Sequence, residues 1–374
     1  EIMKKLMKAI MLLLVVAMTL SLGACTKKEG PSGGETDGED EYMTALIAAA
    51  QEEGELVIYG SCEDPYISAA ADAFQAKYGI TTSWTRLTGG EVQAKIEEEN
   101  GNPSADVWFG GTSDPQSVCA SKGLLMAYDA KNKVNLVSDM YMDADGYWYG
   151  IYTGILGIFY DMEELEAKGI EAPKDWADLL KEEYKGLIWF SNPNTASTAK
   201  LAINTFSQMW GEDEAMKYLV ALDQNVAQYT KSGGGPSKSV GPKECTIGIG
   251  FLHDAVYQID KGYTNIGMSV PTSGTSCEVG ATSIFEGCKH PNAAKLWIEF
   301  CLTPECVELA DDTGSFQFLV LSNASQPAIL DSFDLDPSVA IEYDFADAKE
   351  NTTRRVERFF TEIGSAADDR FKTE

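Results

Sequence analysis

The sequence predicts an α/β protein made of two lobes, and three observations lead to this prediction. The chain has 374 residues, which is longer than one typical domain and long enough for two. Short apolar runs alternate with helix-like segments along most of it, a pattern typical of parallel sheets with helices on both faces. The segment Tyr147 to Asp161, YWYGIYTGILGIFYD, is unusually apolar and rich in glycine, and we expect it to pass as extended chain between the lobes.

The first lobe is predicted from an alternation that begins at Glu55. Runs with apolar and β-branched residues predict strands, and segments with helical periodicity predict the helices between them. The expected strands are ELVIYG (55–60), ITTSWTRL (80–87) and ADVWFG (105–110), and the expected helices are PYISAAADAFQAKYG (65–79) and GEVQAKIEEEN (90–100).

The chain from residue 186 to residue 312 repeats this pattern, which predicts the second lobe up to residue 270 and further elements after it. The expected strands are GLIWF (186–190), NVAQYT (225–230), TIGIGF (246–251), IGMSV (266–270) and GATSIF (280–285). The expected helices are TASTAKLAINTFSQMW (195–210), EDEAMKYLVAL (212–222), a segment after residue 251, HPNAAKLWIEFCLT (290–303) and PECVELADD (304–312). From about Ser338 the chain is expected to be mostly helical, with Arg354, Arg355 and Arg358 on one helix.

These elements divide the body into two lobes that the chain enters in turn. We assign residues 42–152 and 271–374 to lobe 1, and residues 153–270 to lobe 2. The alternative for the segment 147–161 is a hairpin that stays inside one lobe.

The first forty residues predict export and anchoring rather than a folded element. Residues 1–24 combine lysines, an apolar run and small residues before a cysteine, which is typical of a secretory signal peptide. Leu22 to Cys25 has the form of a bacterial lipobox, so we expect Cys25 to be lipidated, and residues 25–41 to be a flexible tether. The protein is then extracytoplasmic and held on the cell membrane; the alternative is an ordinary cleaved signal.

Charge and cysteine usage exclude several function classes. The formal net charge of −29 repels nucleic acid and anionic lipid, so neither is an expected partner. Seven cysteines remain after Cys25, an odd number without a C-x-x-C pair or zinc spacing. We interpret them as scattered, mostly buried thiols, although a disulfide between Cys301 and Cys306 is an alternative.

Polar residues follow several of the predicted strands, where ligands bind in open α/β sheets because loops there enter helices. Most of these loops contain Gly, Ser and Thr, which offer hydroxyls and backbone amides to an anion without any lysine. Each loop taken alone is equally consistent with ordinary helix capping, and only their recurrence favours a binding site. The residues are Ser61, Thr88, Gly89, Ser197 and Thr198.

His253 and Asp254 follow the strand 246–251 and begin a helix. The pair could offer a donor and a carboxylate to the hydroxyls or the amine of a ligand, and Glu278 is a second carboxylate that could complete it. A helix-entry histidine bonded to backbone, beside an ordinary capping aspartate, is the structural alternative.

Catalytic and metal motifs are absent from the sequence. It contains neither G-x-S-x-G nor H-E-x-x-H, and SGGGPSKSVGPK lacks the spacing of a phosphate-binding loop. A single histidine in the expected cleft does not make a metal site. We therefore expect neither a cofactor nor a metal, and no enzymatic activity.

Several stretches in one order resemble the extracytoplasmic solute-binding proteins of ABC importers. Within these, the chain is similar to the group for ferric iron, 2-aminoethylphosphonate and hexose phosphates, which has a type II periplasmic-binding fold. The resemblance covers about residues 55–322. It rests on TGGEVQAKIEEENGNPSADVWFGGTSD, ASKGLLMAY, WYGIYTGILGIFYD, PKDWADLLKEEYKGLIWFSNPNTAST, GIGFLHDA and SVPTSGTSCEVGATSIFEGCKHPNAAKLWIEF.

The resemblance implies two lobes that close by a hinge around one small ligand and then dock on a membrane permease. Iron binders of the group use adjacent tyrosines where this chain has Phe251 to Asp254, so that iron site looks absent. Hexose-phosphate binders use a His-Asp pair and a later glutamate for the sugar hydroxyls, which matches His253, Asp254 and Glu278. The anion-binding loops of the group correspond to Ser61, Thr88-Gly89 and Ser197-Thr198.

Two departures from the group affect the expected phosphate contacts. Relatives often have Ser-Gly before the threonine where this chain has Ala196-Ser197, and a second serine is common at the position of Cys62.

Our leading hypothesis is a monomeric solute-binding lipoprotein that captures a phosphorylated small organic molecule, a sugar phosphate above others. 2-Aminoethylphosphonate, whose ammonium would face the same carboxylates, and ferric iron are the alternatives. A surface phosphoesterase with His253 as base is a hypothesis of another class.

Overall fold

The computed structural model describes residues 36–363 and 369–372, with side chains from residue 41 onward. The predicted signal peptide, Cys25 and the first part of the predicted tether lie outside these residues. Helix α2 (Thr36–Glu53) begins within the segment assigned to the tether, so residues 36–41 are helical. From Met43 onward, the described residues form one compact unit. Within the described residues, no helix combines the length and apolar character needed to cross a bilayer.

Three parallel strands at one end of the sheet form the frame of lobe 1. β1 (Glu55–Gly60) pairs with β2 (Thr81–Arg86) on one side and with β3 (Val107–Thr112) on the other. Each strand leads into a helix; the first two of these helices were predicted from their helical periodicity, and the third was not. These helices are α3 (Asp64–Tyr78), α4 (Gly89–Glu99) and α5 (Ser113–Ser121).

Lobe 2 has its own parallel strands and follows the same pattern. β6 (Ile188–Ser191) lies between β7 (Val226–Thr230) and β8 (Ile247–Phe251) and is parallel to both. β9 (Ile266–Ser269) completes this part of the sheet. The helices of this lobe are α6 (Met162–Lys168), α7 (Ser197–Trp210), α8 (Glu212–Asp223), α9 (Gly235–Val240) and α10 (Leu252–Asp260).

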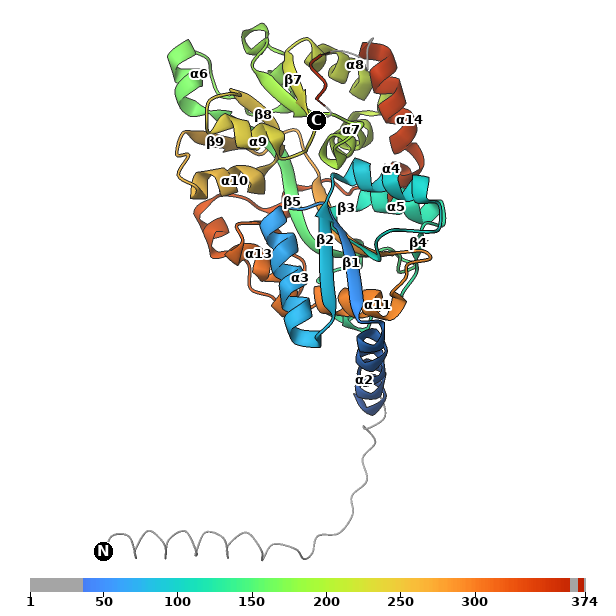
Figure 1. Cartoon of the computed structure of the whole chain (residues 1–374). Coiled ribbons are helices and arrows are strands. Elements are labelled where there is room, and N and C mark those ends of the chain that lie inside the picture. Colours follow the sequence, from blue (N-terminus) through green and yellow to red (C-terminus); the bar gives the residue numbers. More distant parts are fainter. Residues whose placement is uncertain (1–35, 364–368, 373–374) are drawn as a thin grey trace, which may run out of the picture. The chain divides into compact units, whose positions relative to one another are not determined.

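One long strand, β5 (Trp148–Asp161), belongs to both lobes, as predicted for the segment 147–161. Its first half pairs antiparallel with β10 (Cys277–Phe285), and its second half pairs antiparallel with β8 and β9. The strand order β2-β1-β3-β10-β5-β8-β6-β7 is therefore continuous across the molecule. In Figure 1, β5 runs from the part that contains β1–β3 to the part that contains β8 and β9.

This topology fixes where the loops after the strands meet. β5 runs from lobe 1 to lobe 2; β3 is parallel to it through β10, and β8 is antiparallel to it. The carboxyl ends of β1–β3 therefore point toward lobe 2, and those of β6 and β8 point toward lobe 1. Both sets of loops face one cleft, which is where ligands bind in open α/β sheets.

Each lobe has its own hydrophobic core. In lobe 1, Phe74, Trp108 and Trp297 are fully buried in one cluster, and in lobe 2 Trp176 and Phe206 belong to another. Two separate cores joined by strands allow the lobes to move relative to each other, since motion at the cleft does not disturb the packing within either lobe.

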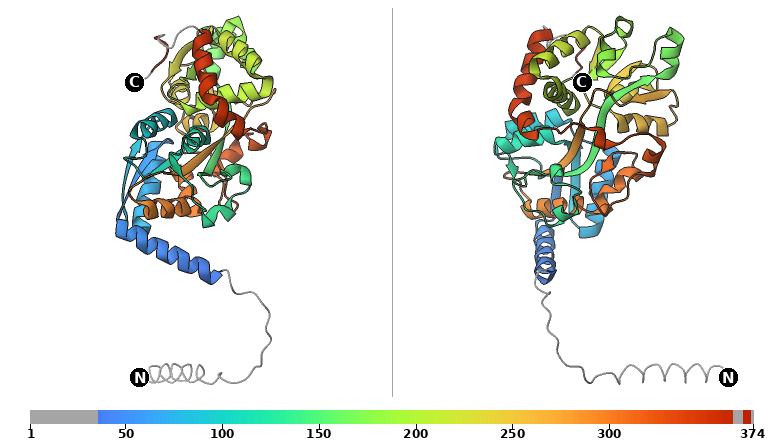
Figure 2. Two further views of the ribbon diagram at one scale, coloured as in Figure 1. Left: turned by 90° about the vertical axis from the view of Figure 1, so that its right-hand side faces the viewer. Right: turned by 180° about the vertical axis from the view of Figure 1, so that it is seen from behind.

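The last helix, α14 (Phe345–Ile363), contacts both lobes. Val356 and Phe359 belong to the lobe 2 core, and the helix also packs against α5 of lobe 1, so the assignment of residues 271–374 to lobe 1 stays a prediction. Charge also holds the helix on lobe 2, because Arg354 and Arg358 pair with Glu212 of α8. Figure 2 shows α14 in red beside the α7 and α8 region.

The remaining elements cover lobe 1 or connect the larger ones. They are α11 (Pro291–Cys301), α12 (Pro304–Val307), α13 (Leu309–Asp312), β4 (Leu125–Met126), β11 (Phe318–Leu319), and the 3-10 helices Lys131–Asn135, Asp139–Tyr141, Trp176–Leu180, Glu182–Tyr184, Ala328–Ser332 and Pro337–Val339. The seven cysteines after Cys25 are all free thiols, and only Cys277 is not buried, in line with the interpretation from sequence.

Candidate functional site

All eight residues that the sequence analysis proposed as ligand contacts line one cavity in the cleft. The cavity has an empty volume of about 520 Å³, counting space open to solvent. Its other lining residues are Cys62, Glu63, Arg86, Gly111, Tyr152, Ala196, Gly233, Gly234, Phe251 and Gln317. The loops meet because each follows the carboxyl end of a strand that points into the cleft.

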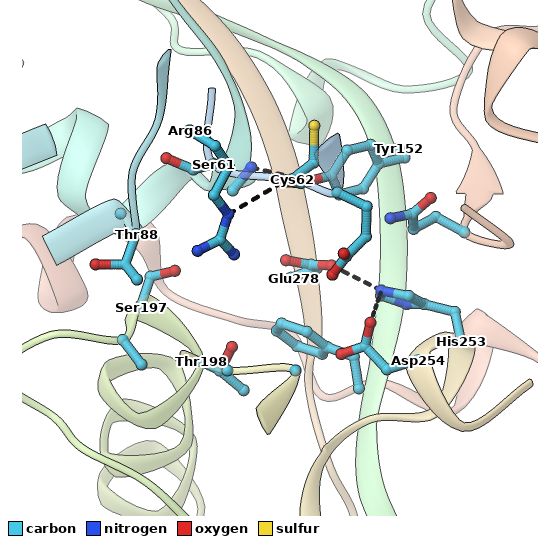
Figure 3. A pocket seen from close by; sticks show the side chains of 18 residues that line it. Ser61, Cys62, Arg86, Thr88, Tyr152, Ser197, Thr198, His253, Asp254 and Glu278 are labelled. Atoms are coloured by element: carbon cyan, nitrogen blue, oxygen red, sulfur yellow. Dashed lines mark hydrogen bonds and ion pairs between the residues drawn. The ribbon is translucent and has the colours of Figure 1, made fainter. Parts of the chain in front are cut away.

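The lining residues separate into two groups (Figure 3). We call Ser61, Arg86, Gly89, Ser197 and Thr198 the anion end, and His253, Asp254 and Glu278 the acid end. Ser61, Ser197 and Thr198 lie on one side of the pocket, and the three acid-end residues lie on the other.

At the anion end, Ser61 is held with its proton free. The indole Nε1–H of Trp108 donates to Ser61 Oγ at 2.9 Å. Because an indole only donates, the serine oxygen is the acceptor in this bond, and its own hydroxyl proton remains available for a ligand. Trp108 itself is fully buried in β3, so the serine is positioned by the core of lobe 1.

Ser197 and Thr198 form the first turn of α7, a helix of 14 residues. The preceding residue, Ala196, provides no side-chain cap, so no side chain occupies the backbone N–H groups of this turn. A helix start of this kind favours an anion through its free N–H groups and its dipole. The hydroxyls of Ser197 and Thr198 point toward the pocket (Figure 3).

Thr88 lines the cavity, but its hydroxyl already has partners. It donates to Glu91 Oε2 at 2.9 Å and accepts from Glu91 N at 3.3 Å, which makes Thr88 the N-cap of α4 in a capping box. Because the Thr88 hydroxyl already makes both of these hydrogen bonds, the residue of this loop that remains available to a ligand is Gly89. A Cβ on Gly89 would lie 3.0 Å from Ser197 Oγ, so glycine allows the two helix starts to approach.

Sequence reasoning missed Arg86, the last residue of β2. It is the only lysine or arginine among the described residues that line the cavity. Its Nε donates to Cys62 O at 3.5 Å, and Asp64 Oδ1 lies 4.0 Å away. Figure 3 shows the guanidinium extending into the pocket on the side of Ser61 and Ser197. A basic residue near the end of a predicted strand, two positions before Thr88, was the signal that could have revealed it.

Tyr152 was also missed, because the sequence does not tell which face of β5 lines the cleft. Its hydroxyl accepts from Gly111 N at 2.8 Å, and the side chain is buried. The hydroxyl proton is therefore directed away from that amide and is available to a neighbouring acceptor.

At the acid end, one imidazole faces two carboxylates. His253 Nε2 lies 3.7 Å from Glu278 Oε1 and 3.8 Å from Asp254 Oδ1. The ring stacks on Phe251, and its Nδ1 is buried with no hydrogen-bond partner among the described residues. A Cβ on Gly154 of β5 would come within 2.3 Å of Nδ1, so only glycine leaves room for the ring in this position.

Burial shifts all three acid-end groups toward their neutral forms. It lowers the pKa of His253 to about 3, raises the pKa of Asp254 to about 7, and raises the pKa of Glu278 well above its usual range. Glu63 raises the pKa of Asp254 further, whereas Lys238 and Arg86 oppose this shift. Of the acid-end atoms, His253 Nδ1 is buried without a partner in the described structure, and a ligand that supplied one would remove that cost.

Neither metal binding nor acid–base catalysis is favoured by this arrangement. Among the described residues, no group of three or more His, Cys, Asp and Glu side chains is arranged to hold a metal ion. An imidazole with a pKa of about 3 is also a weak base at neutral pH, which argues against His253 as a general base.

Known proteins with similar sequences and structures share this architecture. Residues 102–336, more than half of the chain, match the family of bacterial extracellular solute-binding proteins. An uncharacterized protein of Haemophilus influenzae is 39% identical over 334 residues, which cover 86% of this chain and 96% of the relative. A putative 2-aminoethylphosphonate-binding periplasmic protein of Salmonella typhimurium is 26% identical over 185 residues, about half of each chain.

Solved structures agree with the sequence matches. The periplasmic binding protein AfuA from Actinobacillus pleuropneumoniae, solved with exogenous fructose-6-phosphate bound, is 37% identical with a TM-score of 0.80, over 84% of this chain and 99% of AfuA. The periplasmic binding protein P5PA is 27% identical with a TM-score of 0.78, over 83% and 99%. The ferric binding protein from Campylobacter jejuni, 19% identical with a TM-score of 0.72 over 83% and 99%, shares the fold. The chain therefore belongs to the bacterial extracellular solute-binding proteins, the components of ABC importers that capture the solute.

Proposed function

We propose that this protein captures a sugar phosphate in the cleft between its lobes and presents it to an ABC permease. The observation that carries this proposal is the division of one cavity into an anion end and an acid end. A molecule with a phosphate at one end and several hydroxyls at the other complements both.

The anion end supports binding of the phosphate. Arg86 offers a guanidinium, whose planar fork matches phosphate oxygens, and Ser61 and the α7 start offer hydroxyl and amide donors. Most of these donors are neutral, so a chain with a net charge of −29 holds the anion through local geometry rather than its overall field.

The acid end supports binding of sugar hydroxyls. A hydroxyl both donates and accepts, so it can pair with a neutral imidazole, an ionised carboxylate or a protonated carboxyl group. Glu278, whose pKa burial raises well above its usual range, suits such a neutral partner. A relative of 37% identity that was solved with fructose-6-phosphate adds to this reading.

2-Aminoethylphosphonate is the second candidate, because Asp254 and Glu278 form no ion pair with a lysine or arginine in the described structure. An ammonium group placed between them would lower the pKa values of both carboxyl groups and hold both as carboxylates. Half-length similarity to a putative 2-aminoethylphosphonate-binding protein adds to this alternative. Ferric iron and phosphoester hydrolysis lack a comparable observation.

Lipidation of Cys25, membrane anchoring and a monomeric state belong to the same proposal. They follow from the lipobox and from a cleft that one chain builds alone.

Isothermal titration calorimetry of the purified protein tests the proposal. We expect glucose 6-phosphate or fructose 6-phosphate to bind, and free glucose and inorganic phosphate to bind at least about a hundredfold more weakly, because each fills only one end. His253→Ala should weaken sugar-phosphate binding and leave the fold intact by circular dichroism. Tight binding of 2-aminoethylphosphonate, with no heat from either sugar phosphate, would replace the proposal with the second candidate.

A further inference from the structure

A second cavity borders the ligand cavity at the mouth of the cleft. It has an empty volume of about 900 Å³, counting space open to solvent. Its lining residues are Glu63, Asp64, Pro65, Arg86, Ser232, Lys238, Tyr257, Gln258 and Lys261. Glu63 and Arg86 line both cavities, so these side chains stand between the inner and the outer space.

An ion pair between the lobes strengthens this partition. Lys238 Nζ donates to Glu63 Oε2 at 3.1 Å and to Glu63 Oε1 at 3.4 Å. Glu63 precedes α3 in lobe 1, whereas Lys238 lies on α9 in lobe 2. The Glu63 side chain is 26% exposed and that of Lys238 is 48% exposed, which places the pair at the rim of the cleft.

The partition lies next to the acid end of the ligand cavity. A Cβ on Gly234 would contact both Asp254 Oδ2, at 3.4 Å, and Glu63 Oε1, at 3.6 Å. The carboxylates of Glu63 and Asp254 therefore approach the same small residue. A ligand that extends past Asp254 in this direction meets the Glu63–Lys238 pair.

We propose that the Glu63–Lys238 ion pair limits the ligand to a single sugar unit by closing the acid end of the cavity when the lobes come together. This inference rests on the proposed binding of sugar phosphates. A phosphorylated disaccharide, with its phosphate at the anion end, must push its second ring through the ion pair or hold the lobes apart. In both cases Glu63 and Lys238 are pulled apart, and the free energy of their ion pair is lost. This cost weakens binding of the longer ligand.

A second ion pair between the lobes provides a matched control. Lys231 Nζ lies 2.9 Å from Glu91 Oε1, and this pair also joins lobe 2 to lobe 1. Neither residue lines the inner or the outer cavity. Removing Lys231 therefore weakens an interlobe contact without opening the wall between the two spaces.

The test is calorimetric titration with glucose 6-phosphate and with trehalose 6-phosphate, which carries a second glucose on the anomeric carbon of the phosphorylated ring. In the unmodified protein we expect trehalose 6-phosphate to bind at least about a hundredfold more weakly. In the double variant Glu63→Ala/Lys238→Ala, which preserves net charge, this ratio should fall at least about tenfold. Lys231→Ala should retain the ratio of the unmodified protein.

The outcomes separate this inference from the proposed function. If the unmodified protein binds neither sugar phosphate, the proposed function fails. If it binds glucose 6-phosphate and trehalose 6-phosphate with similar affinity, the Glu63–Lys238 pair does not limit ligand length, and only this inference is overturned. The unmodified protein alone is sufficient for that result. An unchanged ratio in the double variant, or a ratio that falls equally in Lys231→Ala, also overturns it. Lys238→Ala alone, at a half-exposed side chain, serves as a second variant if the double variant folds poorly.

Discussion

The anion end of the cleft and the acid end differ in how the protein holds their polar groups. At the anion end, Ser61 accepts from Trp108, and the neighbouring Thr88 caps α4, so hydrogen bonds to the protein fix both side chains. At the acid end, His253 Nδ1 has no hydrogen-bond partner in the described structure, and burial shifts the acid-end groups toward their neutral forms. Under the proposed function, Ser61 is positioned before the ligand binds, whereas the acid-end groups gain hydrogen bonds from the ligand.

We expect the largest effect on affinity from Arg86, the residue of the anion end that carries a full charge. Arg86→Gln removes the guanidinium, and we expect the affinity for a sugar phosphate to fall about a hundredfold, or about 2.7 kcal/mol, because a charge-assisted contact to phosphate is lost. Calorimetry measures the change, and free glucose provides the control, since its weak binding should not move. A loss of affinity below about threefold would mean that the neutral donors alone bind the phosphate.

The next effect concerns the cost of leaving the acid end empty. The pKa of Asp254 in the folded protein, about 7, lies above the ordinary value of 3.8, so folding favours its protonated form. Stability from this group is therefore present at low pH and lost as pH rises through about 7. Between pH 5.5 and pH 7.5 it should cost the ligand-free protein about 2 kcal/mol.

Urea denaturation at the two pH values measures this cost, with Asp254→Asn as the comparison. The variant should show a difference between the two pH values that is about 2 kcal/mol smaller than in the unmodified protein. Equal pH dependence in the two proteins would mean that Asp254 is ionised throughout this range in the empty cleft.

A smaller effect distinguishes hydroxyl from ammonium recognition. Glu278→Gln keeps a hydrogen-bonding group of similar size and removes only the ability to carry charge. For a sugar phosphate we expect about a tenfold loss of affinity, because neutral hydrogen bonds are remade with an amide. For 2-aminoethylphosphonate the loss should exceed a hundredfold, since an ammonium needs the carboxylate. Titration of both ligands into both proteins gives the answer.

The smallest effect tests whether Thr88 belongs to the cap rather than to the ligand. Thr88→Ala removes the N-cap of α4 and should lower the free energy of unfolding by about 1 kcal/mol. Affinity should change less than about threefold. Ser61→Ala, at the anion end, is the matched comparison, and we expect it to show the reverse pattern, with a larger loss in affinity. Equal losses of affinity in the two variants would mean that the Thr88 side chain contacts the ligand.

Local sequence patterns were sufficient for the framework and for much of the site. Alternating strands and helices predicted the sheet, and the rule that ligands lie beyond carboxyl ends brought Ser61, Ser197 and His253 to one cavity. The capping role of Thr88 could also have been predicted, because Thr88-Gly89-Gly90-Glu91 has the spacing of a capping box.

Other features depended on three-dimensional contacts that no local pattern contains. The position of α14 on lobe 2 follows from packing of Phe359 and from pairing with Glu212, residues that are distant in sequence. Because β5 is buried on both faces, its sequence does not alternate between polar and apolar residues. The sequence therefore does not indicate that the face with Tyr152 lines the cleft. The Glu63–Lys238 ion pair joins the start of α3 to α9, two elements of different lobes that are distant in sequence.

The hydrogen bond from Trp108 to Ser61 makes the anion end optically observable. Indole emission depends on the electric field and the polarity around the ring, and the Nε1–H of Trp108 lies 2.9 Å from an oxygen that faces the ligand. Under the proposed function, a phosphate bound at Ser61 would change that field without touching the tryptophan, which is buried in the core of lobe 1. Trp108 would then act as an intrinsic fluorescent reporter of ligand binding, and solute capture could be timed by stopped-flow spectroscopy without a label.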